Sequence, residues 1–438
     1  MNSPNRLQEL VEEYRSQVRD TQLVRAPFFD GVYGERVWIK DESDLAKHPT
    51  GTFKDRRNAE LIARIIECGK FPNQEVLLTT ITSGNSGASL EYWVQRANED
   101  IAARNLGTSA PRFVAVSIVD ISSSLNLGKN LGCYVLPLNL SAHCYELKDI
   151  VREARSFVQP RGHSPAKVLH VELTTFNVRE HRLAGYFGYN PAYTQIVEEI
   201  ELPSFTIVSP VGNGELLRAL ENANSVLGSY NVIGGTVSEN PFGRKILYRA
   251  NASLPQLGIC NTLEELLNGY KTLLQDLQVD PIQAQREVEQ FTTRVQSWNL
   301  GFHLLSHELK CGMSYDPKVY NSPLQFHPVV GVSMADKLAC PESVYAHHFQ
   351  FSGNPEAVVL VGEKDIEQEY ALWQQQGLRC EPSAAVAGVT ARILNQFNQN
   401  NAQKINQMME RLGSESRAVV PYEDVVILNT GRGIDYKE

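Results

Sequence analysis

The sequence lacks three features that would assign it to a class at once: a long apolar run, an excess of positive charge and paired cysteines. No apolar stretch approaches the roughly 20 residues of a transmembrane helix, and residues 1–25 are charged and have no apolar signal core. The net charge of -9 and the pI near 5.7 disfavour nucleic-acid or anionic-membrane binding. The seven cysteines are scattered without a CxxC, which indicates neither a disulfide framework nor a zinc site. We therefore expect a cytoplasmic protein that binds neither nucleic acid nor membrane.

What the chain does have is an alternation of buried strands and helices over 438 residues, enough for two domains. Short apolar runs bounded by turn residues alternate with stretches of helical periodicity, which is typical of parallel sheets with crossover helices. The runs that predict strands are 75–81, 112–119, 132–136, 168–173, 204–210, 232–236, 357–361 and 425–428. We predict an α/β fold with an N-terminal domain at 35–175 and a C-terminal domain at 176–438 together with 1–34. A helical insertion is expected at about 255–325.

The segment around which the chain is organised is a turn, His48-Pro49-Thr50-Gly51-Thr52-Phe53-Lys54-Asp55-Arg56-Arg57, between a strand at 36–40 and a helix at 58–68. Proline and glycine in the turn place Lys54 at or just before the start of the helix. A helix N-terminus disfavours an ammonium ion, and with Arg56 and Arg57 close by the pKa of Lys54 would fall, as a Schiff-base amine requires. Taken alone, the segment is equally typical of a solvated lysine in a surface turn.

Two later loops each join a buried strand to a helix. These are Thr82-Ser83-Gly84-Asn85-Ser86-Gly87 and Val211-Gly212-Asn213-Gly214-Glu215. Such loops direct several backbone N–H groups and the dipole of the following helix at one point, which suits a carboxylate or a phosphate. Alone, each loop is also typical of an ordinary helix cap or tight turn.

The lysine segment resembles that of the fold type II, tryptophan synthase β-like family of pyridoxal-phosphate-dependent enzymes, written Pro-Thr-Gly-Ser-Phe-Lys-Asp-Arg. Only Thr52 differs, and Lys40-Asp41-Glu42 is similar to the Lys-Asp-Glu that precedes the family segment. Farther on, Glu381-Pro382-Ser383-Ala384-Ala385 resembles Glu-Pro-Ser-x-Ala, and Asn429-Thr430-Gly431-Arg432-Gly433 resembles Leu-Thr-Gly-x-Gly. The resemblance implies two doubly wound, three-layer αβα domains with pyridoxal 5'-phosphate in the cleft between them.

The resemblance also implies roles for individual residues. Lys54 is expected to hold the cofactor as a Schiff base and then to act as the catalytic base, with Thr430 facing the pyridine nitrogen. The residues expected to bind the substrate carboxylate are Thr82, Ser83, Gly84, Asn85 and Ser86, of which Asn85 also contacts the 3'-oxygen of the cofactor. The residues expected to bind the cofactor phosphate are Gly212, Asn213, Gly214 and Glu215. Glu215 departs from the small residue that the family prefers, so its carboxylate must point away or weaken phosphate binding.

The substrate is suggested by Arg182-Leu183-Ala184-Gly185, which resembles the Arg-x-x-Gly of threonine synthases, where the arginine binds the substrate phosphate. The Lys-Thr that follows in that family is absent, and an arginine that bridges two surface helices is an equally acceptable interpretation. Since a hydroxyl such as that of Thr430 cannot keep the ring nitrogen protonated, elimination and replacement are favoured over transamination.

We therefore predict a carbon–oxygen lyase of amino-acid biosynthesis, similar to threonine synthase, that converts O-phosphohomoserine to threonine and phosphate. A β-replacing synthase of the cysteine synthase or cysteate synthase type is the alternative, because residues 82–87 are similar to Thr-Ser-Gly-Asn-Thr-Gly. A serine or threonine dehydratase and a catalytically silent scaffold follow. Relatives are commonly homodimers, so a homodimer is expected. His303, His307, His347 and His348 lack a metal-binding pattern, and no metal is expected.

Overall fold

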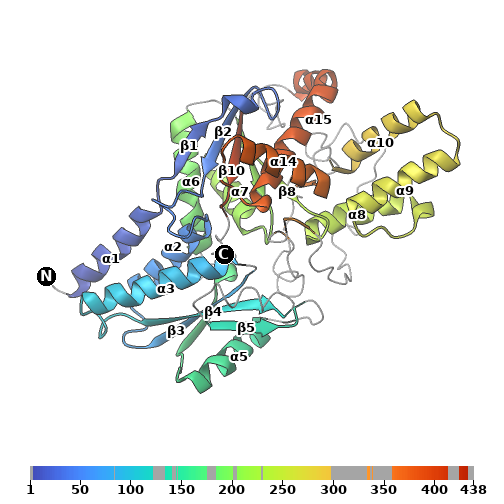
Figure 1. Ribbon diagram of the computed structural model, residues 1–438. Coiled ribbons are helices and arrows are strands. Elements are labelled where there is room, and N and C mark those ends of the chain that lie inside the picture. Colours follow the sequence, from blue (N-terminus) through green and yellow to red (C-terminus); the bar gives the residue numbers. More distant parts are fainter. Residues whose placement is uncertain are drawn as a thin grey trace.

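Two sheets with helices on both faces make up the protein, seen in a computed structural model (Figure 1). The structure describes residues 3–82, 84–121, 134–140, 145, 147–174, 184–200, 205–227, 230–296, 333–335, 338, 358–412 and 424–432. The strand orders are β1-β2-β10-β7-β8-β9 and β5-β4-β3-β6. Neighbouring strands are parallel except β1 and β2, which are antiparallel. The predicted α/β class is confirmed.

The four-stranded sheet consists of β3 (Glu75–Ile81), β4 (Arg112–Asp120), β5 (Tyr134–Leu138) and β6 (Lys167–His170). The central strands β3 and β4 are buried along nearly their whole length, as their continuous apolar runs predict for a covered parallel sheet. One face packs against α1 (Ser3–Gln17), α2 (Lys54–Glu67) and α3 (Asn85–Ala103), and the other packs against α5 (Leu147–Val158). The first residue of α2 is Lys54, so Lys54 stands at the N-terminus of a helix that packs on this sheet.

The six-stranded sheet is formed by β1 (Gln22–Arg25), β2 (Arg36–Asp41), β7 (Phe205–Pro210), β8 (Tyr230–Thr236), β9 (Val358–Leu360) and β10 (Asp424–Asn429). Helices α6 (Ala184–Ile200) and α7 (Glu215–Leu227) cover one face, and α14 (Glu363–Gln375) and α15 (Pro382–Leu412) cover the other. Although β2 lies within the range 35–175, it pairs with β10 in this sheet. The lysine turn therefore connects the two sheets.

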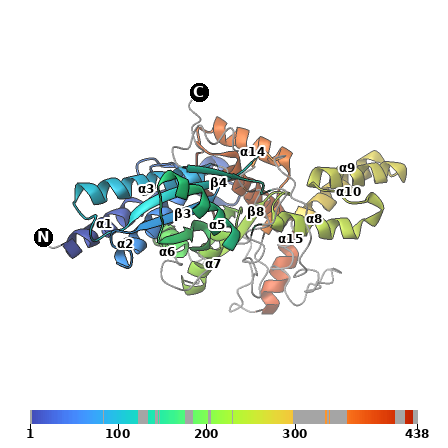
Figure 2. The same ribbon diagram turned by 90° about the horizontal axis from the view of Figure 1, so that it is seen from below.

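Three helices of the second half form an arm that projects beyond the six-stranded sheet, as both ribbon views show (Figures 1 and 2). They are α8 (Pro241–Ser253), α9 (Leu263–Asp276) and α10 (Pro281–Gln296), and they share an apolar core with Leu360 of β9. The predicted helices at 262–277 and 281–297 are confirmed, whereas the rest of the insertion lies outside the described residues. In the described part of the chain, short 3-10 helices lie at Pro27–Phe29, Gln159–Arg161, Val171–Thr174 and Pro255–Leu257.

Hydropathy distinguishes these helices from membrane spans. Within the described ranges, no helix combines the length and the apolar character that crossing a bilayer requires.

Candidate functional site

The backbone of the turn just before Lys54 is bonded to the residues that follow strand β10. The backbone N–H of Phe53 donates to the carbonyl of Thr430 at 3.1 Å, and Thr52 forms an isolated antiparallel bridge with Gly431. Gly51 has a φ of +65°, and a Cβ atom there would lie 2.8 Å from Cγ of Arg432, so the turn requires glycine. Two segments that the sequence places at opposite ends of the chain therefore meet directly at Lys54.

The turn before Lys54 is also tied to helix α3 through Asp55, a residue to which the sequence assigned no role. Its buried carboxylate accepts hydrogen bonds from the backbone N–H of Thr50 at 2.9 Å and the Thr50 hydroxyl at 2.8 Å. It accepts two more from α3, from the Ser89 hydroxyl at 2.6 Å and Trp93 Nε1 at 3.0 Å. Asp55 thus locks the turn to the layer of helices that follows it.

Arg56 forms a buried ion pair with Glu42, the residue that follows β2. Its Nε lies 2.7 Å from Glu42 Oε2, and a second N–H donates to Glu42 Oε1 at 3.0 Å. Burial raises the pKa of Glu42, but Arg56 and the nearby His48 outweigh it and lower that pKa to about 2. The positive charge of Arg56, which we expected to act on Lys54, is therefore compensated by Glu42.

Lys40 is the last but one residue of the same strand, and its side chain is buried. Its Nζ donates to the carbonyl of Thr21 at 2.8 Å and to the side chain of Gln195 on α6. Burial lowers the pKa of Lys40 to about 8. Lys40 and Glu42 belong to the Lys-Asp-Glu sequence that resembles the family. Their contacts attach the end of β2 to Thr21 and to Arg56.

The loop after β3 is shaped by Thr82. The Thr82 hydroxyl accepts hydrogen bonds from the backbone N–H groups of Gly84 at 2.8 Å and Gly87 at 3.1 Å, and Gly84 has a φ of +143°. Asn85 begins α3 and donates from Nδ2 to Glu381 Oε2 at 2.8 Å. Ser83 lies outside the described residues. The loop predicted to bind the substrate carboxylate therefore contacts the Glu-Pro-Ser segment at the start of α15.

Ser86 belongs to the same loop, but its hydroxyl takes part in a buried network. The hydroxyl accepts a hydrogen bond from Arg57 at 2.7 Å, lies 2.7 Å from the Thr80 hydroxyl and donates to Glu172 Oε1 at 3.1 Å. Because the Ser86 hydroxyl is engaged in this network, the predicted binding of a substrate carboxylate would use the backbone N–H of Ser86. That role stays a prediction.

The glycine loop between β7 and α7 is the predicted phosphate site. Gly214 has a φ of +79°, and the side chain of Asn213 accepts a hydrogen bond from the backbone N–H of Glu215 at 3.1 Å. The Glu215 carboxylate is fully buried and accepts a hydrogen bond from Arg57 at 2.7 Å. Because Arg57 neutralises the one carboxylate in the loop, these residues fit an anion such as a phosphate. Arg182, predicted to bind a second phosphate, lies outside the described residues.

Asn240, which no sequence pattern indicated, forms hydrogen bonds with the backbone of the glycine loop. This buried side chain donates from Nδ2 to the carbonyls of Gly212 at 2.9 Å and Leu338 at 2.6 Å. The Thr236 hydroxyl donates to the carbonyl of Val211 at 2.9 Å. Asn240 lies 28 positions after Gly212 in an ordinary turn, so no local pattern points to it.

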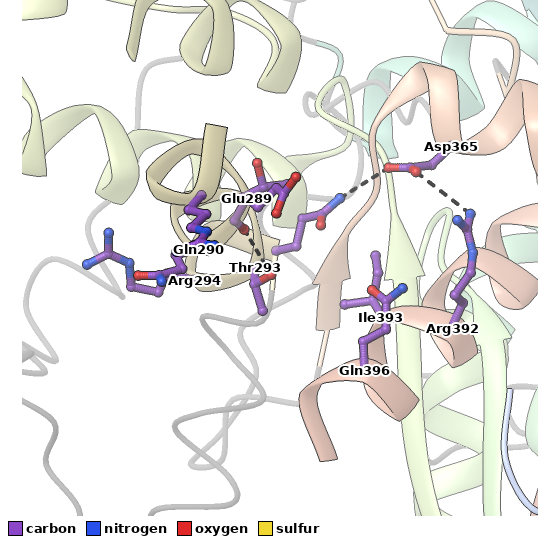
Figure 3. A pocket seen from close by; sticks show the side chains of 11 residues that line it. Glu289, Gln290, Thr293, Arg294, Asp365, Arg392, Ile393 and Gln396 are labelled. Carbon is purple, nitrogen blue, oxygen red and sulfur yellow. Dashed lines mark hydrogen bonds and ion pairs between the residues drawn. The ribbon is translucent and has the colours of Figure 1, made fainter. Parts of the chain in front are cut away.

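A separate pocket of about 960 Å³ lies between α10, α14 and α15 (Figure 3). Gln296 donates to Asp365 at 3.4 Å, and Arg392 approaches Asp365 at 3.7 Å. No residue predicted from the sequence as a site residue lines this pocket.

Metal ligands do not gather in the part of the chain that the structure describes. Among those residues, no three His, Cys, Asp or Glu side chains are placed to hold an ion together. The four histidines considered from the sequence, His303, His307, His347 and His348, lie outside the described residues.

Several solved structures have the same architecture, and the three described next are enzymes. A hydrogen sulfide-producing enzyme from Fusobacterium nucleatum is 11% identical, with a TM-score of 0.53 over 97% of this chain and 98% of that chain. Diaminopropionate ammonia lyase from Escherichia coli in complex with D-serine is 13% identical, with a TM-score of 0.52 over 98% and 89%. A pyridoxal 5'-phosphate-dependent aspartate racemase is 13% identical, with a TM-score of 0.50 over 98% and 95%.

At these identities the matches establish the fold, which is the two-sheet α/β fold of the tryptophan synthase β-like, fold type II structures. No protein-family model matches the sequence, and no curated protein does.

Proposed function

We propose that the protein is a pyridoxal-phosphate-dependent enzyme that acts on a small amino acid by elimination and replacement. The observation that supports this most strongly is the convergence of the predicted segments on the start of α2. Phe53, next to Lys54, bonds to Thr430, and Arg57, one turn along the helix, bonds to both Ser86 and Glu215. Two of the structural neighbours add support, since one is named as pyridoxal-phosphate-dependent and the other was solved with D-serine.

Each segment has a role in this proposal. Lys54 would hold the cofactor covalently, residues 212–215 would bind its phosphate, Asn85 its 3'-oxygen and Thr430 its ring nitrogen. When bound, the cofactor supplies an electron sink for a carbanion at the substrate α-carbon. Residues 82–86 would orient the substrate carboxylate, so that the Lys54 amine, once free, removes the α-proton as a base.

For the substrate we propose O-phosphohomoserine, which reacts with one molecule of water to give threonine and phosphate. Three resemblances to threonine synthases support it: Arg182 with Gly185, the segment Glu381-Pro382-Ser383, and Thr430 with Gly431. In the structure the last two segments are joined, because the N–H of Glu381 donates to the carbonyl of Gly431 at 2.9 Å. A β-replacing synthase is the second candidate, favoured by the cysteine-synthase-like loop that the Thr82 hydroxyl closes.

The experiment that tests the proposal begins with cofactor binding. We expect the protein to acquire a visible absorbance band with pyridoxal 5'-phosphate, which a catalytically silent scaffold need not do. Phosphate release from O-phosphohomoserine is then compared with sulfide-dependent turnover of O-acetylserine. Phosphate release supports the first candidate, sulfide-dependent turnover supports the second, and the absence of a band contradicts the proposal.

A further inference from the structure

Arg57 lies at the centre of the buried contacts that join the three predicted segments. It is fully buried and follows the Lys54-Asp55-Arg56 sequence. Its Nη1 donates to Glu215 Oε2 at 2.7 Å, and its Nη2 donates to the Ser86 hydroxyl at 2.7 Å. One guanidinium on the lysine helix α2 therefore holds the start of α7 and the start of α3.

The charges around Arg57 explain why a carboxylate can occupy the glycine loop. Glu215 is also fully buried, and a buried carboxylate without a cationic partner costs several kcal/mol. Burial lowers the pKa of Arg57, but Glu215, Tyr189 and Glu172 outweigh it and raise that pKa, so Arg57 is charged. The guanidinium therefore offsets the negative charge that Glu215 places beside residues 212–215.

A second carboxylate, that of Glu172, approaches the same nitrogen of Arg57 that donates to Glu215. Glu172 Oε1 lies 3.6 Å from Arg57 Nη1, and its other oxygen lies 3.2 Å from His170 Nε2. Burial raises the pKa of Glu172, but His170 and Arg57 outweigh it and lower that pKa. Glu172 also accepts hydrogen bonds from the hydroxyls of Thr80 and Ser86. Glu215 and Glu172 therefore both lie beside one nitrogen of the guanidinium, while its other terminal nitrogen donates to Ser86.

We infer that Arg57 is a positioning residue that neutralises Glu215 and thereby sets the affinity of residues 212–215 for the cofactor phosphate, while it orients Ser86 in the neighbouring loop. The inference rests on the proposed function, because it assumes that this loop receives a phosphate. It goes beyond that function by assigning a role in cofactor affinity to Arg57, which lies one position after the eight residues that resemble the family segment.

The inference predicts opposite effects for the two partners. Arg57→Gln removes the positive charge that offsets the Glu215 carboxylate beside the phosphate, so affinity for pyridoxal 5'-phosphate falls at least about tenfold. Glu215→Gln keeps a hydrogen-bond acceptor for Arg57 but removes the negative charge, so affinity rises about threefold or more. The double variant returns to within about threefold of the wild type. A role in packing alone weakens binding in both single variants.

The measurement is the dissociation constant of pyridoxal 5'-phosphate for the full chain stripped of cofactor, followed by absorbance, with thermal unfolding recorded for each variant. Arg64→Gln is the matched control, because Arg64 lies on the same helix and pairs with Glu60 at 2.6 Å away from the loop. We expect its affinity to equal that of the wild type.

The outcomes separate the inference from the proposed function. A wild-type protein that binds no pyridoxal 5'-phosphate contradicts the proposed function. A wild type that binds, together with an Arg57→Gln variant of equal affinity or a Glu215→Gln variant that binds more weakly, overturns the inference alone. If Arg57→Gln does not fold, the direction of change in Glu215→Gln decides the matter by itself.

Discussion

At the scale of one residue, Gly51 is a position in the lysine turn where a side chain would be strained and would contact Arg432. Replacing it with alanine puts a side chain at a φ of +65° and a Cβ 2.8 Å from Arg432. We expect Gly51→Ala to lower the free energy of unfolding by about 2–4 kcal/mol, from backbone strain and overpacking together. Urea denaturation measures this loss.

The matched control is Gly69→Ala, because Gly69 has a φ of +62° but nothing lies within 4 Å of the place where a Cβ atom would stand. Its cost is confined to strain, about 1 kcal/mol. Equal losses in the two variants would refute the contact between Gly51 and Arg432 as a source of destabilisation.

Glu369 provides a pH-dependent contribution to stability. It is buried on α14, accepts hydrogen bonds from Tyr33 and from Trp373 Nε1, the latter at 3.1 Å, and lies 3.3 Å from Arg392. Burial outweighs the effects of Arg392 and Trp373 and raises the pKa of Glu369 to about 7. A carboxyl whose pKa is raised on folding stabilises the protein below its unfolded pKa of 4.5 and loses that contribution as the pH rises through 7.

We therefore expect the free energy of unfolding to carry a term from Glu369 that falls by about 1–3 kcal/mol between pH 4.5 and pH 8. In Glu369→Gln this term is absent, so the variant loses less stability than the wild type over the same range. Denaturation at several pH values measures the difference. Parallel pH profiles for the two proteins would show that Glu369 does not titrate in this window.

Among the elements, the glycine loop depends on a side chain of the following turn. Asn240→Ala removes the hydrogen bonds to the carbonyls of Gly212 and Leu338. We expect a loss of about 1–3 kcal/mol in the free energy of unfolding, because buried carbonyls lose their partner, and weaker binding of pyridoxal 5'-phosphate. Denaturation and absorbance titration measure the two effects.

Asn251→Ala is the control for that prediction. Asn251 donates in the same way to the carbonyls of Leu247 at 3.0 Å and Cys260 at 2.9 Å, but within the arm. It should lose stability without a change in cofactor affinity. An Asn240→Ala variant that is destabilised but binds the cofactor normally would argue against a role for Asn240 in the loop.

Most elements could be predicted from periodicity, because burial on a parallel sheet produces unbroken apolar runs. Strand β3 matches its predicted range, and β4 and β10 differ by one or two residues. Helix α2 begins at Lys54, where the turn residues predict its start and four residues before its apolar pattern, whereas α3 begins at Asn85, inside the loop predicted at 82–87. Small and polar residues in the first turn of a helix carry no periodicity, so those boundaries depend on the turn that precedes them.

The buried partners of the site were beyond the reach of sequence patterns. Glu215 stood out as a departure from the family, but its partner Arg57 is 158 positions away. Likewise, β2 joins the six-stranded sheet by pairing with β10, and the ion pair between Arg36 and Asp424 spans 388 positions. Contacts of this kind arise from the tertiary fold and leave no local pattern in the sequence.

At the scale of the whole molecule, the lysine turn connects the two sheets. Strand β2 lies in the six-stranded sheet, α2 packs against the four-stranded sheet, and the turn between them is bonded to the end of β10. Open α/β sheets bind ligands outside the carboxyl ends of their strands, where β10 and β3 both end at loops that contact this region. The position of Lys54 therefore follows from the topology of both halves.

Covalent trapping of the cofactor at Lys54 tests this account most directly. The protein is incubated with pyridoxal 5'-phosphate, reduced with borohydride to fix the carbon–nitrogen bond, digested and analysed by mass spectrometry. We expect the phosphopyridoxyl group on the peptide that contains Lys54, and no such label in Lys54→Ala. A label on another lysine, or none at all in the wild-type protein, would contradict the account.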